Sequence, residues 1–380
     1  MKNMAVYGSA AGKLGGARVR QVGFSLIELM VAITISLLMM VAVLQLFLDV
    51  SRTNDEMTKT NAQIENGRFA IQLIANDLVH GGFWDGFVPQ FDDLTSTDVP
   101  ADYPAAVPDP CLAFASWDVA YRSALLGIPV QTYEAAPSGC STVVQSQKTA
   151  TDVLVLRHAD TCLPGAANCE ADTVATATPK VYFQPSLCAS ASAYAYVLGT
   201  SGFTLQKRSC LASEPTARRK YVSNIYFIRN DNTLMRAEFG GAGGTEWSVQ
   251  PLIEGVEGFA VELGIDNRSD TGAAVDYNAA VSWANPLNKT SPTNRGDGAP
   301  DGAFVRCTTA SPCTVGQLAN VVAVKVYVLV RSLQATSGYS DGKTYALGST
   351  TLGPFNDGFK RHVYSTTVRL NNVSARRETP

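Results

Sequence analysis

The sequence predicts an α+β protein, in which one long N-terminal helix is followed by a head built on antiparallel β-sheet. Three observations predict this class. No proline occurs between residues 24 and 80, so one uninterrupted helix is possible there. Beyond Gly82 the helical period gives way to short runs of alternating apolar and polar residues, which are typical of strands. All eight cysteines and several long loops rich in Pro, Gly and Ser lie in this second part, which indicates loops held by disulfides.

Composition excludes some classes of protein. The chain has 380 residues, of which 46% are hydrophobic and 17% charged, so it is not a disordered tail. The net charge is -3, which gives no basic field of the kind that attracts DNA or RNA, and we expect no direct nucleic-acid partner. The mean hydropathy of +0.03 is too low for several membrane spans, so the position of the apolar residues decides the class.

The apolar residues are concentrated in one segment. Residues 29–48 contain no charged side chain, and about 20 residues are enough to cross a bilayer as a helix. Residues 1–23 contain four basic residues and no acidic ones: Lys2, Lys13, Arg18 and Arg20. This charge difference predicts a single-pass protein whose N-terminus stays in the cytoplasm while the bulk of the chain lies across the membrane.

One ionisable residue, Glu28, lies at the start of the apolar segment. A charged group costs about 2.5 to 3.5 kcal/mol at the bilayer centre and less near the interface, so this carboxylate is expected to need a partner of opposite charge. The alternative is that its side chain reaches the interface without a partner. An ordinary signal peptide is cut after its apolar segment at small residues, whereas here the small residue, Gly23, precedes the segment.

Residues 23–33 read Gly-Phe-Ser-Leu-Ile-Glu-Leu-Met-Val-Ala-Ile, and this stretch resembles the signature of type IV prepilins and of type II secretion pseudopilins. The resemblance implies that a prepilin peptidase cuts after Gly23 and methylates the new N-terminus, Phe24. It also implies that Glu28 pairs with the N-terminal amine of a neighbouring subunit, which would offset the cost of a lone carboxylate in hydrocarbon. Residues 1–23 would be the leader, and their removal takes four positive charges away, so the net charge falls from -3 to -7.

The helical pattern continues beyond the apolar segment. Apolar residues recur every seven positions, as expected for an amphipathic helix that lies on a domain. The stripe consists of Val50, Met57, Ile64, Ile71 and Leu78, widened by Phe69, Leu73 and Ile74. Gly81 and Gly82 are expected to end the helix. We therefore expect residues 24–48 to be the transmembrane and filament-core part of one helix, residues 49–82 its amphipathic second half, and residues 83–380 a β-rich periplasmic head.

Three further stretches resemble, more narrowly, the PilW group of minor pilins. They are residues 63–83, 252–266 and 361–370, while residues 88–217 show little resemblance to this group. The resemblance implies a pilin-like fold and an inner-membrane precursor that becomes part of a pilus at the cell surface. The implied partners are other minor pilins, the major pilin, the prepilin peptidase and the inner-membrane assembly machinery.

The strand pattern is clearest in residues 322–330, where valine occupies every second position and one face is expected to be buried. Further strands are expected at residues 152–158, 180–184, 203–208, 221–229, 234–239, 259–265 and 362–370, with a hairpin turn at residues 230–232. We expect these strands to form an antiparallel sheet packed against the second half of the helix. Long loops are expected at residues 89–110, 240–244 and 284–302.

The even number of cysteines on the far side of the membrane favours disulfides. The cysteines are Cys111, Cys140, Cys162, Cys169, Cys188, Cys210, Cys307 and Cys313. Eight cysteines allow roughly a hundred pairings, so spacing does not fix the connectivity. We expect pairing in chain order, above all Cys162 with Cys169 and Cys307 with Cys313, since each pair closes a short loop. Zinc is the alternative, but the sequence has no C-x-x-C and only three histidines.

Two other patterns resemble functional sites. Residues 338–342 satisfy G-x-S-x-G, the nucleophile elbow of hydrolases, but that elbow needs a strand before it and a helix after it, and the pattern predicts neither. We expect a loop there and no enzymatic activity. Asp266 and Asp270 are candidate calcium ligands, because carboxylates cluster there in a loop as they do in calcium sites, and some pseudopilins related to this group hold calcium. The spacing does not fit an EF-hand loop, and Asx turns are the alternative. We expect no cofactor and no other metal site.

The resemblance implies a structural role. We expect a minor pilin that helps to initiate type IV pilus assembly, lies at or near the pilus tip, and supports twitching motility and adhesion, with DNA uptake as a further role of the family. One alternative is a J-type pseudopilin of a type II secretion system. A more remote one is a membrane-anchored periplasmic hydrolase, which would keep Met1 as its N-terminus.

Overall fold

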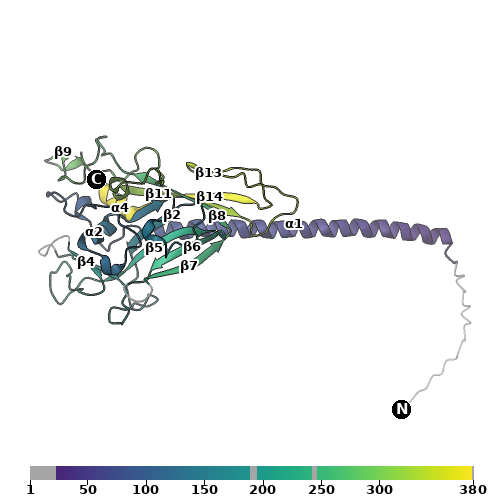
Figure 1. Cartoon of the computed structure of the whole chain (residues 1–380), viewed down its shortest axis with the longest axis horizontal. Helices are drawn as coiled ribbons and strands as arrows, with labels where there is room; N and C mark the ends of the chain where they lie inside the picture. The colour runs from purple at the N-terminus through teal and green to yellow at the C-terminus, as the bar shows by residue number, and fades with distance from the viewer. Residues whose placement is uncertain (1–22, 189–194, 242–245, 379–380) are drawn as a thin grey trace, which may run out of the picture. The chain divides into compact units, whose positions relative to one another are not determined.

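The computed structural model describes residues 23–188, 195–241 and 246–378. The chain forms two compact units, residues 1–57 and residues 58–380, and each is described by itself. Helix α1 (Leu26–His80) has 55 residues, begins in the first unit and ends in the second (Figure 1). The prediction of one uninterrupted helix is confirmed, and it ends where Gly82 adopts a positive φ of 72°, a conformation that glycine adopts without strain.

The described part of the first unit is the first half of α1 with the residues just before it. Every residue from 23 to 55 is exposed. This half of α1 is long and apolar enough to cross a membrane by length and composition.

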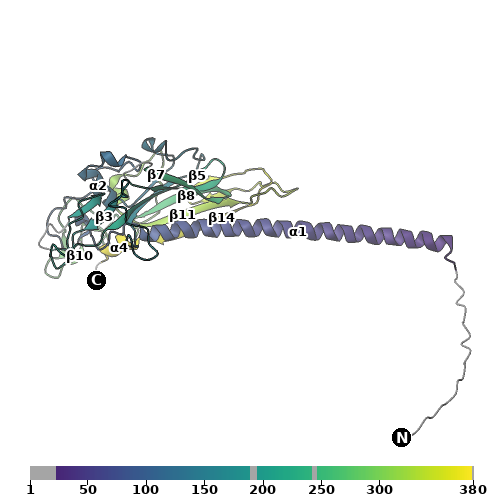
Figure 2. The same ribbon diagram turned by 90° about the horizontal axis from the view of Figure 1, so that it is seen from below.

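The second unit is built on antiparallel β-sheet, as predicted, but its main strands form two sheets and not the single one expected (Figure 2). The larger sheet consists of β1 (Val130–Tyr133), β2 (Val153–Ala159), β3 (Tyr182–Pro185), β4 (Tyr196–Gly199), β5 (Arg219–Arg229), β6 (Thr233–Phe239) and β7 (Trp247–Glu254). The smaller sheet has the order β14 (Arg361–Arg369), β11 (Val321–Arg331), β8 (Val256–Ile265). The turn at residues 230–232 joins β5 to β6, as expected.

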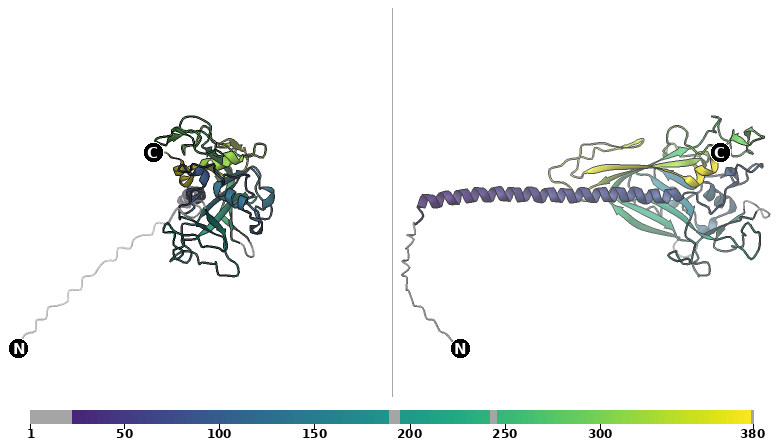
Figure 3. Two further views of the ribbon diagram at one scale, coloured as in Figure 1. Left: turned by 90° about the vertical axis from the view of Figure 1, so that its left-hand side faces the viewer. Right: turned by 180° about the vertical axis from the view of Figure 1, so that it is seen from behind.

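Short elements complete the second unit. They are the hairpins β9 (Trp283–Asn285) with β10 (Thr290–Pro292) and β12 (Tyr345–Leu347) with β13 (Thr350–Leu352), the helices α2 (Val119–Gly127), α3 (Val315–Ala319) and α4 (Asn371–Arg377), and 3-10 turns at Gln90–Asp92, Phe114–Ser116 and Ser138–Cys140. Figure 3 shows α4, in yellow, beside the end of α1. Asn372 and Arg376 of α4 hold this position, because they donate hydrogen bonds to the carbonyl groups of Val79 and Gly82.

The main core lies where the second half of α1 meets both sheets. Ala70, Ile74 and Leu78 of α1 pack there with Leu154 of β2 and with the valines of β11 at positions 322–330. The prediction that this valine face is buried is confirmed. The alternating pattern suggested that the other face of β11 is exposed to solvent, and this is wrong. Leu329 on that face is fully buried, because the β12–β13 hairpin covers it.

One strand prediction and one loop prediction fail for local reasons. Residues 203–208 alternate in polarity but make a single β-bridge, from Gln206 to Pro215. The predicted loop at residues 284–302 contains the β9–β10 hairpin, whose three-residue strands are too short for a periodicity argument.

Candidate functional site

The start of α1 is closed by a reciprocal cap. The Ser25 N–H donates to Glu28 Oε2 at 2.9 Å, and the Glu28 N–H donates to Ser25 Oγ at 3.3 Å. This is the capping box that a Ser-x-x-Glu sequence forms at a helix N-terminus. The sequence Ser25-Leu26-Ile27-Glu28 contained that signal, but the charge argument alone did not use it. Within the described chain the Glu28 carboxylate therefore has a neutral partner and no cation.

The residues before the cap are open to solvent. Phe24 is 86% exposed, and a side-chain atom placed on Gly23 would meet nothing within 4 Å. Both residues precede the regular helix, whose first bond runs from the Leu29 N–H to the Ser25 carbonyl. The Gly23–Phe24 peptide bond is thus sterically accessible and outside regular secondary structure, as a cleaved bond must be.

The first half of α1 presents a continuous apolar surface. Eighteen large apolar side chains between residues 24 and 48 are each 48% to 86% exposed. At about 1.5 kcal/mol for each large side chain removed from water, covering them is worth on the order of 25 kcal/mol. Only lipid or other apolar helices provide cover over such a length.

The second half of α1 is fixed in the head by polar and small residues as well as apolar ones. The Gln63 amide donates to the carbonyls of Val330, at 2.7 Å, and Lys360, at 3.1 Å, and so bridges β11 and the start of β14. Gly67 lies against the ring of Tyr364, where an added Cβ would come within 2.1 Å of a ring carbon. The helix can approach β14 this closely only because residue 67 has no side chain.

The predicted seven-residue stripe is therefore wrong in part. The buried positions of α1 are Gln63, Gly67, Ala70, Ile74 and Leu78, whereas the stripe residues Met57 and Phe69 are 59% and 56% exposed. A search for apolar periodicity assigns leucine, isoleucine and phenylalanine to the buried face of a helix. It does not find a buried glycine that allows a close approach or a buried glutamine that bonds to the backbone.

The end of α1 is held by a buried acid–base pair. Asp77 Oδ1 lies 3.0 Å from His158 Nε2, and Asp77 Oδ2 accepts hydrogen bonds from Asn224 and Tyr226. Burial alone would lower the pKa of His158, but the hydrogen bond and charge of Asp77 outweigh it, and the pKa is raised. His158 Nδ1 faces the Ala159 carbonyl at 2.9 Å, so both ring nitrogens face acceptors. This geometry fits the doubly protonated imidazolium.

The two calcium candidates have different partners. Asp266 is fully buried; its Oδ2 accepts from the Gly298 N–H at 3.0 Å and lies 3.4 Å from Arg377 Nη1. Burial raises the pKa of Asp266 to about 6. Asp270 is exposed and accepts a hydrogen bond from Ser291. Among the residues that the structure describes, no group of three or more His, Cys, Asp or Glu could hold a metal ion, so calcium binding at Asp266 and Asp270 stays a prediction.

The G-x-S-x-G pattern lies in a loop, as expected. Ser340 is exposed in an irregular segment, and the next regular element is the three-residue strand β12. Asp341 of the same pattern is fully buried and pairs with Arg361. A nucleophile elbow needs a strand-to-helix turn, which this segment does not form.

All eight cysteines form disulfides in the second unit. The pairs join successive cysteines: Cys111–Cys140, Cys162–Cys169, Cys188–Cys210 and Cys307–Cys313. This is the chain-order pairing expected from the sequence, and it leaves no cysteine for zinc. The bonds fasten loops to the core, since Cys140 and Cys307 are buried in two of its clusters.

Two family models match parts of this chain. Residues 225–372 match the family described as type IV pilus-assembly protein W, PilW. Residues 18–44 match the prokaryotic N-terminal methylation motif. Among solved structures, the chain is similar to a type IV-like pilin, TTHA1219, from Thermus thermophilus, at 14% identity and a TM-score of 0.25, over 60% of this chain and 81% of that one. No curated protein matches the chain significantly.

Proposed function

We propose that this chain, which matches the PilW family of type IV pilins over residues 225–372 and the N-terminal methylation motif over residues 18–44, is a minor pilin that helps to initiate pilus assembly and lies at or near the pilus tip. In this role it supports twitching motility and adhesion, and it contributes to DNA uptake where the pilus does so. Its partners are the other minor pilins, the major pilin and the inner-membrane assembly machinery.

The observation that carries the proposal is the state of Glu28. Its carboxylate lies at the start of an exposed apolar helix and receives a hydrogen bond only from the Ser25 N–H among the described residues. A carboxylate in or near hydrocarbon is strongly favoured by an added cation. The N-terminal amine that cleavage after Gly23 creates on Phe24 is such a cation, and it is supplied by a neighbouring subunit when helices pack side by side.

The same proposal places the precursor in the inner membrane. The basic leader, residues 1–23, stays in the cytoplasm, residues 24–48 span the bilayer, and the disulfide-bonded head folds in the periplasm. A prepilin peptidase then removes the leader, and the apolar surface of α1 passes from lipid to the core of the filament.

The experiment compares two charge-neutralising variants of α1. Glu28→Gln is expected to abolish incorporation into sheared pili while the protein remains membrane-bound with its four disulfides formed. Glu65→Gln, which alters an exposed acid of the same helix outside the apolar segment, is the matched control and is expected to incorporate normally. Normal piliation and incorporation of the Glu28→Gln variant would contradict the proposal.

A J-type pseudopilin shares the N-terminal signature, and the PilW match over residues 225–372 favours the pilus over that alternative. Deletion of the gene is therefore expected to abolish twitching motility and leave exoprotein secretion unchanged. Loss of secretion with intact motility would favour the pseudopilin.

A further inference from the structure

A cleft of about 480 Å³ lies between the second half of α1, the start of β14 and the loop that joins β11 to β14. Its lining comprises Thr60, Gln63, Ile64, Arg68, Tyr339, Lys343, Lys360, Arg361, His362 and Tyr364. The volume falls within the range of small-molecule sites, which are about 300 to 1,000 Å³. All of these residues belong to the second unit.

The charge of this cleft opposes that of the protein. Apart from Arg361, whose charge is compensated by carboxylates, three of its lining residues are Arg or Lys and none is Asp or Glu, although the chain carries more acidic than basic residues. Arg68 and Lys343 are exposed, and neither forms an ion pair with a described residue. Cations that converge on a cleft without carboxylates raise the local concentration of anions.

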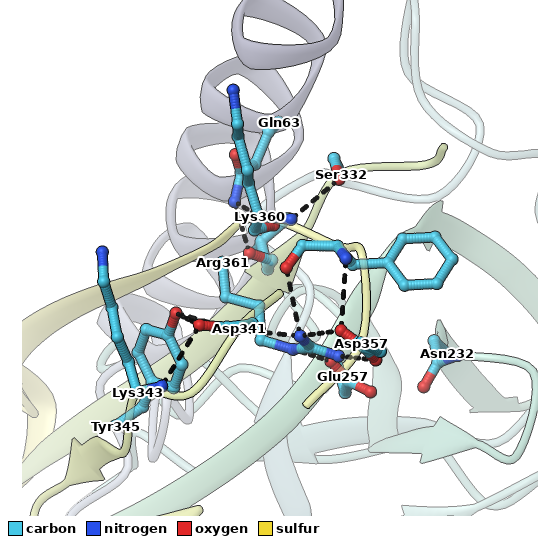
Figure 4. Close-up of polar contacts among 12 residues, drawn as sticks. Gln63, Asn232, Glu257, Ser332, Asp341, Lys343, Tyr345, Asp357, Lys360 and Arg361 are labelled. Carbon is cyan, nitrogen blue, oxygen red and sulfur yellow. Dashed lines mark hydrogen bonds and ion pairs between the residues drawn. The ribbon is translucent and has the colours of Figure 1, made fainter. Parts of the chain in front are cut away.

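Arg361 does not serve as a free cation in the cleft, because its guanidinium group holds the surrounding loop in place (Figure 4). Its side chain is fully buried and contacts three carboxylates: Glu257 at 2.5 Å, Asp341 at 2.9 Å and Asp357 at 2.6 Å. Asp341 also accepts hydrogen bonds from the Tyr345 hydroxyl and the Lys343 N–H. The loop that carries Tyr339 and Lys343 is thereby held against β14. Figure 4 shows the Lys343 side chain extending away from the carboxylates around Arg361.

One polar atom of the lining has no partner. The Tyr364 hydroxyl is buried and makes no hydrogen bond with any described residue. A buried hydroxyl left unsatisfied costs about 1 to 3 kcal/mol, so the wall of the cleft contains a polar group that the described residues do not satisfy. The Tyr339 and Tyr364 rings and the exposed side of Ile64 supply an apolar wall beside the cations.

We propose that this cleft binds an organic anion, whose carboxylate or phosphate group lies between Arg68 and Lys343 and whose apolar body lies against Tyr339, Tyr364 and Ile64. The proposal depends on the head alone, so it stands or falls independently of Glu28 and pilus assembly.

The test titrates three probes of one shape into the mature full chain, residues 24–380, in lipid nanodiscs, with empty nanodiscs as the background. Phenylacetate carries a carboxylate, phenyl phosphate a phosphate, and 2-phenylethanol no charge. Saturable binding of one or both anions, measured by calorimetry, is expected, with no binding of 2-phenylethanol above background. A preference for phenylacetate or for phenyl phosphate identifies the anionic group.

Variants locate the site. Arg68→Gln with Lys343→Gln is expected to weaken anion binding by roughly tenfold or more. Lys207→Gln with Lys289→Gln removes the same charge from exposed residues outside the cleft and is expected to leave affinity unchanged. The proposal is overturned by the absence of saturable anion binding to the wild type, by equal binding of 2-phenylethanol, or by equal affinity in both double variants. Because all four side chains are exposed, the fold does not depend on them.

Discussion

The buried Arg361 cluster allows a quantitative prediction about the head. Replacing Arg361 with Met keeps an apolar side chain against Phe355, whose ring centroid lies 3.8 Å from the guanidinium carbon, but it removes the charge. Removing one partner of a buried ion pair costs about 3 to 5 kcal/mol, because the other partner is left uncompensated. Here Glu257 keeps Lys148, at 3.4 Å, and the Asp357 side chain is 36% exposed. We therefore expect Arg361→Met to lower the free energy of unfolding by an amount near the lower limit of this range, about 3 kcal/mol.

The assay is equilibrium unfolding in urea at pH 7 with the disulfides intact, followed by circular dichroism. Arg369→Met on the same strand is the matched control, because Arg369 is 50% exposed and its ion pair with Glu378 is at the surface; such a pair contributes about 1 kcal/mol or less. Hydrogen exchange of residues 332–360 is expected to rise in Arg361→Met alone, since Arg361 holds that loop through Asp341 and Asp357.

The pH dependence of the stability difference between the wild type and Arg361→Met gives a second test of this prediction. Burial opposes ionisation of Asp341, but the hydrogen bonds from Arg361 and Tyr345 outweigh it and lower the pKa of this carboxyl; the hydrogen bond from Arg361 likewise lowers the pKa of Asp357. The stability that they contribute is present above their ordinary value of 3.8 and is lost as the pH falls through the lowered values. The difference between wild type and Arg361→Met should therefore shrink between pH 7 and pH 3. Equal stability of the Arg361→Met and Arg369→Met variants at pH 7 would refute the reasoning.

Two further predictions concern the seating of α1. Gly67→Ala should destabilise the head by about 1 to 3 kcal/mol through overpacking against Tyr364, although alanine is the better helix former by about 1 kcal/mol. Adding Tyr364→Leu to this variant should restore most of the lost stability. An unchanged or higher melting temperature of Gly67→Ala alone would be evidence against the close packing. Because the pKa of His158 is raised above 6.5 by Asp77, the contribution of this pair is fully present below pH 6.5 and is lost as the pH rises through the raised value. Stability measured between pH 6 and 9 should thus fall in the wild type and be flatter in Asp77→Asn, and identical slopes would contradict the assignment.

The sequence predicted those features that depend on local pattern. The absence of proline and the two glycines after His80 defined α1, and alternating valines located β11. The buried face of α1 could not be predicted in full, because the need for glycine at residue 67 arises from Tyr364, which is nearly 300 residues away in the chain. The same holds for the Arg361 cluster, whose three acids come from β8 and two separate points of the β11–β14 loop.

The N-terminal residues, unlike the Arg361 cluster, can be identified from the sequence alone. The roles of Gly23, Phe24 and Glu28 are predictions drawn from consecutive residues, because a signature of this kind is local. The anion cleft was not predicted, since its residues come from α1, the β11–β14 loop and β14 and share no spacing. Only folding places Arg68 and Lys343 on the same cleft.

The central claim, that this chain is processed and assembled as a pilin, is tested most directly by mass spectrometry of the N-terminal peptide of the protein isolated from membranes. The account predicts a peptide that begins with N-methylated Phe24, with residues 1–23 absent. A protein that keeps Met1 or Met4 at its N-terminus in cells with an active prepilin peptidase would contradict it.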